Sequence, residues 1–468
     1  MRSLVLFRND LRVLDNPALT HAAKQGEVVC LFVYDPSDYG GAAKWWLHHS
    51  LKSLSKELGA LHIATGDSTA AVLDAVATYE IDAVFWNRRY EPKGIAQDTG
   101  LKAAIKALGL EAESFAGSLL NEPWVIKNKS GGPFKVFSPY WRACLAGPAP
   151  AAPLPRPSLS LFANGATDID GLKLLPTDPD WAAGFVPEWA PGESGAHARF
   201  EEFLAHEFLG YKTGRDRPDQ SHVSRLSPHL HFGEISPRQI WHRVQHHVAM
   251  HTAAQRDADK FLAELGWREF SHSLLYHNPD LPEVNLNRSF DAYPWDSNAE
   301  ALRAWQKGMT GYPLVDAGLR ELWATGYMHN RVRMVVASFL IKHLRLDWRH
   351  GAEWFWDTLL DADLANNSAS WQWVAGSGAD AAPYFRVFNP TTQGQKFDPD
   401  GSYIRKWCPE LAALPNKVIH APFEAPLLVL QAAGVKLGDT YPHPIVDHKE
   451  ARAAALAGYE AVKAQSSS

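Results

Sequence analysis

The chain has 468 residues, of which 46% are hydrophobic and 21% are charged, and its formal net charge is −6. This length leaves room for two or three domains, and the composition is typical of a soluble globular protein rather than a disordered or fibrous chain. The charge balance excludes a protein that is basic overall, although a local basic groove for nucleic acid remains compatible with it.

Three cysteines, Cys30, Cys144 and Cys408, lie far apart in the sequence. They fit neither a disulfide framework nor a zinc ribbon, and an iron–sulfur cluster needs more of them. We therefore expect a protein of a reducing compartment, the cytoplasm. The N-terminal sequence MRSLVLFRNDLR is charged within its first eight residues. This predicts neither a signal peptide nor a membrane span, so we expect no membrane partner.

The first 125 residues alternate short apolar runs with helical patterns. The apolar runs, which have the length of strands, cover residues 4–7, 28–34, 61–64 and 83–86. The helical patterns cover residues 17–24, 44–58, 69–79 and 97–108. This order predicts an α/β domain with a doubly wound, Rossmann-like parallel sheet and a ligand crevice at the carboxyl ends of its strands. No GxGxxG motif follows the first strand, so ordinary dinucleotide binding is not supported.

Downstream of the sheet region the pattern changes twice. The tract GPAPAAPLPRP at 147–157 has no periodicity and predicts an extended connector. From about residue 196 apolar residues recur at helical spacing, as in Phe200, Phe203 and Leu204. We therefore predict an α/β domain at 1–125, a linker at 126–195 and one large all-α domain at 196–468.

Three polar clusters of the helical region are candidate binding segments. The segment YKTGRDRPDQSHVSRLS at 211–227 is rich in hydroxyls and arginines, which suits either a phosphate site or a capped polar loop. Glu264, Trp267 and Arg268 share one helix face, either at a ligand or as an amphipathic helix with a Glu–Arg pair. A further helix face holds Asn330, Arg333 and Met334, and Arg331 beside them could pair with Asp361 or Asp363.

The fourth cluster is the stretch 361–389, which mixes polar residues with large rings. It holds two acids one residue apart, an asparagine pair at 366–367, and Trp371 and Trp373 on either side of one glutamine. Unpaired buried polar groups are costly, and a solvated loop does not carry so many rings. The mixture predicts a ring-shaped ligand held by polar groups beside a stacking surface.

Four histidines of one predicted helix have spacings that could also hold a metal ion. His242, His246, His247 and His251 include i, i+4 spacings that a divalent cation can use. A solvated helix face explains the same pattern, so we expect no metal.

Several long motifs together resemble the photolyase/cryptochrome family. They are TGRDRPDQSHVSRLSPHLHFGEISP, ELGWREF, GYPLVDAGLRELWATGYMHNRVRM, LDADLANNSASWQW and RVFNPTTQGQKFDPDGSYIRKW. With FRNDLRVLDNPAL near the N-terminus, the resemblance covers nearly the whole chain. FWDTLLDADL and the segment APLLVLQAAGVKLGDTYPHPIVDHKEAR are most similar to the class III cyclobutane pyrimidine dimer photolyases, which are related to plant cryptochromes.

The resemblance implies FAD, held in a folded, U-shaped form by the helical domain. Arg331 and Asp361 match an ion pair beside the isoalloxazine, and Asn367 matches the position that faces flavin N5. An amide there can donate to or accept from N5 and so tune the cofactor's electronics. The cofactor contacts implied by the resemblance are Tyr211, Val223, Ser224, Arg225, Leu226, Ser227, Phe261, Glu264, Arg268, Asn330, Arg331, Asp361, Ala362, Asp363 and Asn367.

For DNA, the resemblance implies a pyrimidine dimer flipped out of the duplex into a pocket. Trp267 and Trp373 match rings that flank the dimer, and Glu264 and Asn330 match groups that hydrogen-bond it. A protonated Glu264 would stabilise the dimer radical anion. The remaining lesion and phosphate contacts are Arg215, Arg333, Met334, Arg386 and Lys396. Enzymes for the (6-4) lesion usually place two histidines at this pocket, so its Asn330 and Met334 favour the cyclobutane dimer.

The resemblance also assigns Trp371, Trp348 and Trp295 to a tryptophan chain from the flavin to the surface, where spacing alone left three core tryptophans as the alternative. The catalytic residues it implies are Glu264, Asn330, Asn367, Trp371, Trp348 and Trp295.

The implied function is light-driven repair of UV-damaged DNA by a monomeric deoxyribodipyrimidine photolyase. The alternative is a cryptochrome-type blue-light photoreceptor without repair activity. Asn367 favours repair because cryptochromes often carry another residue there, and so does the lack of a long polar C-terminal extension. The branch also implies a 5,10-methenyltetrahydrofolate antenna in the α/β crevice. Many relatives have an Asn-Glu pair where YEPKG here places Lys93 and Gly94, so no antenna residue is assigned.

Overall fold

The computed structural model describes residues 1–162, 168–380 and 385–466. It forms two compact units, each assembled from segments that are distant in the sequence. The sheet unit comprises Met1–Lys212, Val223–Pro279 and Leu360–Asn366. The helical unit comprises Thr213–His222, Asp280–Leu359 and Asn367–Ser468.

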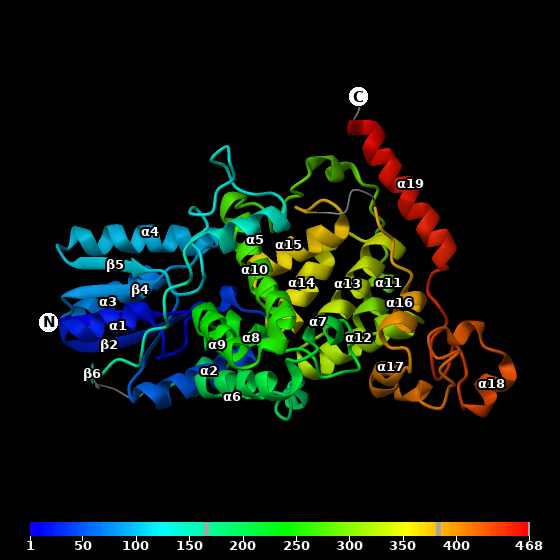
Figure 1. Ribbon diagram of the computed structural model, residues 1–468, viewed down its shortest axis with the longest axis horizontal. Helices are drawn as coiled ribbons and strands as arrows, with labels where there is room; N and C mark the ends of the chain where they lie inside the picture. The colour runs from blue at the N-terminus through cyan, green and yellow to red at the C-terminus, as the bar shows by residue number, and fades with distance from the viewer. Residues whose placement is uncertain (163–167, 381–384, 467–468) are drawn as a thin grey trace. The chain divides into compact units, whose positions relative to one another are not determined.

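The sheet unit is built on a parallel sheet with the strand order β3-β2-β1-β4-β5 (Figure 1). A short strand, β6, pairs in parallel with the first residues of β2, so β2 is flanked by β6 and β3 in succession. The strands are β1 (Arg2–Phe7), β2 (Glu27–Tyr34), β3 (His62–Thr65), β4 (Ala83–Asn87), β5 (Glu111–Phe115) and β6 (Ser160–Leu161).

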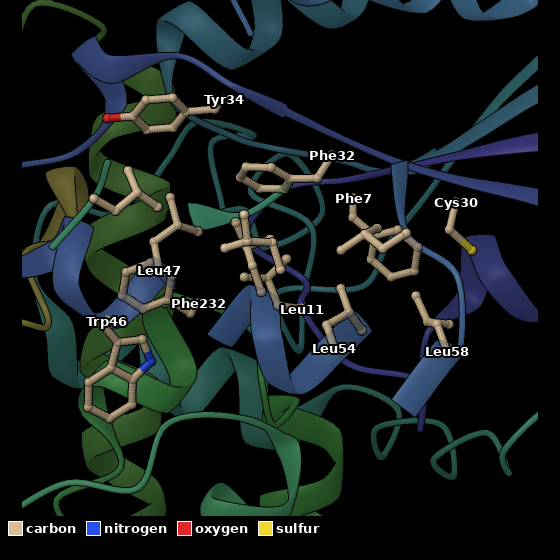
Figure 2. Close-up of a cluster of buried hydrophobic side chains, with 14 of the residues drawn as sticks. Phe7, Leu11, Cys30, Phe32, Tyr34, Trp46, Leu47, Leu54, Leu58 and Phe232 are labelled. Carbon is tan, nitrogen blue, oxygen red and sulfur yellow. The ribbon is translucent and has the colours of Figure 1, made fainter. Parts of the chain in front are cut away.

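Helices cover both faces of this sheet because its central strands are apolar on both sides. In β1, Val5 and Phe7 belong to a core on the face covered by α1 and α2, whereas Leu4 and Leu6 belong to a core with α3 and α4. Figure 2 shows Phe7 of the first core among its neighbours. The helices are α1 (Pro17–Gln25), α2 (Gly41–Leu58), α3 (Ser68–Thr78) and α4 (Pro92–Ala107). The predicted doubly wound α/β fold is confirmed.

Local sequence signals set several of these helix boundaries. Asn16 caps α1 by accepting a hydrogen bond from the Leu19 amide at 3.1 Å, and Pro17 occupies the first turn, where no amide is needed. α2 ends at Gly59, whose φ of +82° is a left-handed conformation that favours glycine. These signals explain why predicted and observed helices agree closely.

Further helices and connecting segments complete the sheet unit, and Phe232 among them joins the core of the sheet. Phe232, which follows α8, stacks on Trp46 of α2 with ring centroids 6.2 Å apart, and the Trp46 indole donates to Glu234 at 2.9 Å. These contacts fix the residues that follow α8 relative to α2. The helices are α5 (Phe137–Ala146), α6 (Glu193–Glu202), α8 (Ser227–His231), α9 (Pro237–Met250) and α10 (Gln255–His277). The short helix α7 (Tyr211–Gly214) begins in the sheet unit and ends in the helical unit. The predicted boundaries at residues 125 and 195 stay a prediction.

The helical unit contains the second half of the predicted all-α region. Its apolar pattern at 332–340 runs through α13 into a π-helical turn, Phe339–His343. Along the last helix, Tyr459 stacks on Phe385 with centroids 4.8 Å apart. The helices are α11 (Ala299–Gln306), α12 (Pro313–Thr325), α13 (Asn330–Ser338), α14 (Trp348–Thr358), α15 (Leu364–Ala375), α16 (Pro390–Phe397), α17 (Ser402–Trp407), α18 (Leu427–Ala432) and α19 (His448–Ser466). The start of α15, up to Asn366, belongs to the sheet unit.

Across residues 1–162, 168–380 and 385–466, no helix combines the length and the apolar character needed to cross a bilayer.

Candidate functional site

The polar segment before α8 is held in place from one side by Arg199. The guanidinium of this residue donates to the carbonyls of Ser224 and Val223 at 2.9 and 3.0 Å. Arg225 has a φ of +54°, and its side chain pairs with Glu188 at 3.0 Å. Because the Arg225 guanidinium is engaged there, we expect any contact of Arg225 with a cofactor to come from its backbone.

Apolar side chains support the same segment. Tyr211 and Phe261 are each 5% exposed and meet edge to face with ring centroids 5.3 Å apart. Leu226 is 2% exposed, and its amide donates to the Ser224 hydroxyl at 3.4 Å. The segment therefore rests on a packed base, which leaves Ser227 at the start of α8.

Helix α10 carries four of the predicted residues, with Glu264, Trp267 and Arg268 following Phe261. Glu264 forms an ion pair with Lys260, one turn earlier, at 2.8 Å. Arg268 donates to the Ser118 carbonyl at 2.8 Å. Trp267 lies flat on Phe137, with ring centroids 3.8 Å apart and planes 10° apart. One face of this indole is thus covered, so a stacking ligand would use the opposite face.

A charged group gathers around Asp363. His272 Nε2 lies 3.4 Å from a carboxylate oxygen of Asp363, and the other oxygen accepts from the Asn366 amide at 2.8 Å, capping α15. Burial by itself would raise the pKa of Asp363, but His272, His231 and Arg268 outweigh it and hold the pKa well below its usual range. Asp363 is therefore an anion at neutral pH.

His231 is a residue of this group that the sequence did not single out. It is 9% exposed, and neither ring nitrogen has a hydrogen-bond partner among the described residues. Burial lowers the pKa of His231. A buried, unpartnered imidazole is costly unless a ligand completes its hydrogen bonds. Its only signal in the sequence is its place within SPHLHFG.

In the helical unit, basic residues surround the start of α13. His329 caps this helix by accepting from the Arg331 amide at 3.2 Å, and Arg331 pairs with Asp216 at 3.0 Å. Arg333 donates to the Met328 carbonyl at 2.7 Å. Burial and the charge of Arg215, followed by Arg333 and Arg331 against the opposing effect of Asp216, lower the pKa of His329 to about 4. Burial is the larger cause of the low pKa, and the three arginines add a positive local charge that suits a polyanion.

Two further predicted residues, Asn330 and Met334, lie on α13. Asn330, the first residue of α13, is exposed, and the Met334 sulfur accepts from Arg331 at 3.6 Å. The predicted pairing of Arg331 with Asp361 joins residues of the two units and stays a prediction.

Asn367 and the three predicted tryptophans of the electron chain belong to the helical unit. The Asn367 amide nitrogen donates to the Ala352 carbonyl at 3.0 Å, which fixes the side chain. Trp371 is 2% exposed and Trp348 is fully buried, whereas Trp295 is partly exposed. The Trp348 indole donates to Asn285 at 2.9 Å. Of the three rings, Trp295 is the one that solvent reaches.

Around Trp373, aromatic and basic side chains line a cavity of about 50 Å³. The Trp373 indole donates to the Asp380 carbonyl at 3.0 Å. Lys342 donates to the Arg386 carbonyl and lies 4.4 Å from the Phe385 ring centroid. Burial, followed by the charge of Arg386, lowers the pKa of Lys342 to about 7. The Arg386 side chain is exposed, as is Lys396 on α16.

The predicted residues therefore fall into two sets. The sheet unit holds Tyr211, Val223, Ser224, Arg225, Leu226, Ser227, Phe261, Glu264, Trp267, Arg268, Asp361, Ala362 and Asp363. The helical unit holds Arg215, Trp295, Asn330, Arg331, Arg333, Met334, Trp348, Asn367, Trp371, Trp373, Arg386 and Lys396. Their roles toward a cofactor or DNA stay predictions.

Comparison with known proteins agrees with this organisation. Residues 3–158 match the family described as DNA photolyase, and residues 261–461 match the FAD binding domain of DNA photolyase. The chain is 50% identical over 471 residues to a deoxyribodipyrimidine photo-lyase of Agrobacterium fabrum, covering 98% of each protein. It is 39% identical to cryptochrome-1 of Arabidopsis thaliana over 96% of this chain and 69% of that protein.

Among solved structures, a bacterial class III photolyase from Agrobacterium tumefaciens superposes with a TM-score of 0.96 at 50% identity, covering 99% of this chain and 98% of that one. The chain belongs to the photolyase/cryptochrome family, as its motifs predicted.

Proposed function

We propose that this protein is a deoxyribodipyrimidine photolyase that splits cyclobutane pyrimidine dimers in UV-damaged DNA with light. Asn367 carries the choice of repair within the family. Its nitrogen is engaged by the Ala352 carbonyl, so the amide orientation is fixed and its oxygen is the atom left for a cofactor. The positive field around His329 supports a DNA partner although the net charge is −6.

The residues of the sheet unit fit FAD. His231 supports this fit, because its two buried ring nitrogens have no partner among residues 1–162, 168–380 and 385–466. Arg268 and the Ser224–Ser227 segment would hold the phosphates, and the Tyr211–Phe261 pair would keep the site dry. When bound, reduced FAD supplies an electron donor that light excites.

The chain's own residues then have distinct tasks toward the lesion. Trp267, supported by Phe137, and Trp373, fixed through its indole nitrogen, would replace the stacking that a flipped dimer loses. Glu264 would exchange its pairing with Lys260 for a hydrogen bond to the dimer. After the two carbon–carbon bonds that join the pyrimidines in the cyclobutane ring have broken, the electron would return from the pyrimidine product to its donor, and two intact pyrimidines would remain.

Trp371, Trp348 and Trp295 would carry an electron inward to regenerate the reduced cofactor. The two buried rings exclude water, and the partly exposed Trp295 can be reached by an external reductant. This route differs from the path to the lesion, so the two functions are separable by mutation.

The antenna is a finer part of the proposal. We infer 5,10-methenyltetrahydrofolate without assigning contacts to it. Lys93 already pairs with Asp35 at 2.7 Å and also contacts Asp38. Partial burial raises the pKa of Asp35, but hydrogen bonds from Lys93 and Ser37 outweigh it and lower the pKa to about 2. A Cβ at Gly94 would lie 2.4 Å from a carboxylate oxygen of Glu91. The folate would therefore be bound by other residues of the crevice.

The deciding experiment illuminates the reduced, monomeric protein with an oligonucleotide that contains one cyclobutane dimer. Loss of the dimer in light and not in darkness is the expected result. The similarity to cryptochrome-1 across 96% of this chain favours a signalling photoreceptor as the second candidate. A protein that binds FAD and responds to blue light, yet leaves the dimer intact, would establish that alternative.

A further inference from the structure

The edge of the sheet brings together three side chains that are distant in the sequence. His21 of α1 and Glu111 and Glu113 of β5 each offer one ligand atom, and these atoms lie within 4.8 Å of one another. All three residues belong to the sheet unit. Their convergence depends on the packing of α1 against β5.

The strand pleat explains why both acids point toward the helix. Glu111 pairs with Ala83 and Glu113 pairs with Phe85 in the register of β4 and β5. Ala83 and Phe85 belong to the core under α1, and residues paired in parallel strands share a face. Both carboxylates therefore lie on the α1 side of the sheet, beyond the apolar core, at a strand that ends the sheet.

The histidine is oriented by its surroundings. Its ring meets Phe85 at 4.8 Å and Phe115 at 5.0 Å between centroids. The Gln25 amide lies 3.0 Å from Nε2 of the same ring. In metal-bound histidines the ring nitrogen away from the metal donates to its polar partner, so a metal at Nδ1 would require the Gln25 amide to turn and present its oxygen to Nε2.

The two acids have no partner of their own. Neither Glu111 nor Glu113 forms a hydrogen bond or ion pair through its side chain with any residue of 1–162, 168–380 or 385–466. Two facing carboxylates repel unless a cation lies between them. Acids alone would be an ordinary solvated edge, but here a nitrogen ligand from a second element completes the set.

We propose that His21, Glu111 and Glu113 bind one divalent transition-metal ion, of the Zn²⁺ type, which clips α1 to the edge strand β5. One imidazole and two carboxylates form a mixed nitrogen and oxygen set, which suits Zn²⁺ better than Ca²⁺ or Mg²⁺. Small side-chain rotations suffice to bring the donors to about 2.0–2.2 Å from a zinc ion. Water would complete the coordination, because the two acids are exposed.

The site is independent of repair and can be tested on the full chain after treatment with EDTA. Zn²⁺ affinity is measured by competition with a chromophoric chelator, and Co²⁺ is added to report the ligand geometry by visible absorption. We expect one saturable equivalent. Glu113→Gln and His21→Gln should each weaken binding at least tenfold and abolish the Co²⁺ band.

The helix with four histidines provides a matched control. His247 and His251 lie with ring centroids 4.7 Å apart and are the competing place for a metal. His251→Gln should leave the affinity unchanged. The proposal is overturned if His251→Gln removes the binding, if no saturable equivalent is found, or if Glu113→Gln binds as the unmodified chain does.

A second readout does not depend on the chelator. Zn²⁺ should raise the melting temperature of the unmodified chain and not that of Glu113→Gln, since only a ligand that binds the folded state stabilises it. Glu113 is exposed, so its isosteric replacement leaves the core intact. An equal rise in both proteins would show that the stabilising ion binds elsewhere.

Discussion

The close approach of Gly351 to Trp371 predicts that Gly351→Ala destabilises the protein when residue 371 is Trp and stabilises it when residue 371 is Phe. Gly351 lies in α14, facing the indole of Trp371. A Cβ built at this glycine would lie 2.0 Å from Cη2 and 2.4 Å from Cζ3 of that ring. Real carbon–carbon contacts are about 3.5–4.0 Å, so Gly351→Ala forces the ring to move.

The expected magnitudes follow from two opposing effects. Overpacking a rigid core site costs about 3 kcal/mol at the upper end, and replacing glycine by alanine inside a helix returns about 1 kcal/mol. Gly351→Ala should therefore destabilise the protein by about 2 kcal/mol. In a Trp371→Phe background the overlapping part of the indole is absent. The same Gly351→Ala change should there stabilise by up to about 1 kcal/mol, a coupling of about 2–3 kcal/mol.

The assay is urea unfolding of all four proteins, compared by the shift in midpoint of the transition that contains the helical unit. An equal effect of Gly351→Ala in both backgrounds would refute the packing argument.

The same variants test the electron chain. Trp371→Phe should slow photoreduction of oxidised FAD and leave repair by the pre-reduced enzyme nearly intact. An equal loss of both activities would show that Trp371 is structural.

Three further predictions concern charge and stacking. Arg386→Ala should lower the slope of the log–log salt dependence of DNA binding by about 0.9 and weaken binding of damaged and undamaged DNA alike. Trp373→Ala should keep this slope and remove about 1–3 kcal/mol of the preference for the lesion. If Trp373→Ala weakened binding of both DNAs equally, the dimer pocket would lie elsewhere. The folded-state pKa of His329, lowered from 6.5 to about 4, leaves it neutral while the unfolded chain takes up a proton. The contribution of His329 to the free energy of unfolding is therefore complete above pH 6.5, and about 2 kcal/mol of it is lost as the pH falls from 7 to 5. Unfolding of His329→Asn, which retains a helix cap, should lack this loss, and an unchanged pH profile would contradict the assignment. Asp363→Asn should lower the free energy of unfolding at neutral pH. Because the pKa of the carboxyl is lowered in the folded protein, the difference in unfolding free energy between the variant and the unmodified chain should shrink below about pH 4. A difference that is constant with pH would exclude the His272 pairing as its cause.

Strands were predictable where apolar side chains fill both faces. β1 and β4 are fully buried along most of their length, and both were placed within a few residues. β5 was missed because its sequence, EAESF, carries two acids in five residues. An edge strand needs only part of one face to be apolar, so its pattern is weak in the sequence. The acids that hid this strand are the ones that now meet His21.

The candidate site also has a part that the sequence predicted and a part that only the structure revealed. Long motifs identified the residue types and the family, including Asn367, Trp371 and the basic residues near α13. They did not reveal that Trp267 rests on Phe137, that Arg199 holds the Ser224 carbonyl, or that His231 is buried without a partner. Each of these depends on which distant surfaces meet, and no local pattern records that.

The sequence by itself determined the βα rhythm, the helical character after residue 196 and the chemistry of the family's motifs, because periodicity, caps and residue type act over a few neighbouring positions. Only the tertiary structure decided which charges are paired. It lowered the pKa of His329 by burial among three arginines, and it joined His21 to acids some 90 positions away. Burial and Coulomb energies depend on distance in space, and the fold sets that distance.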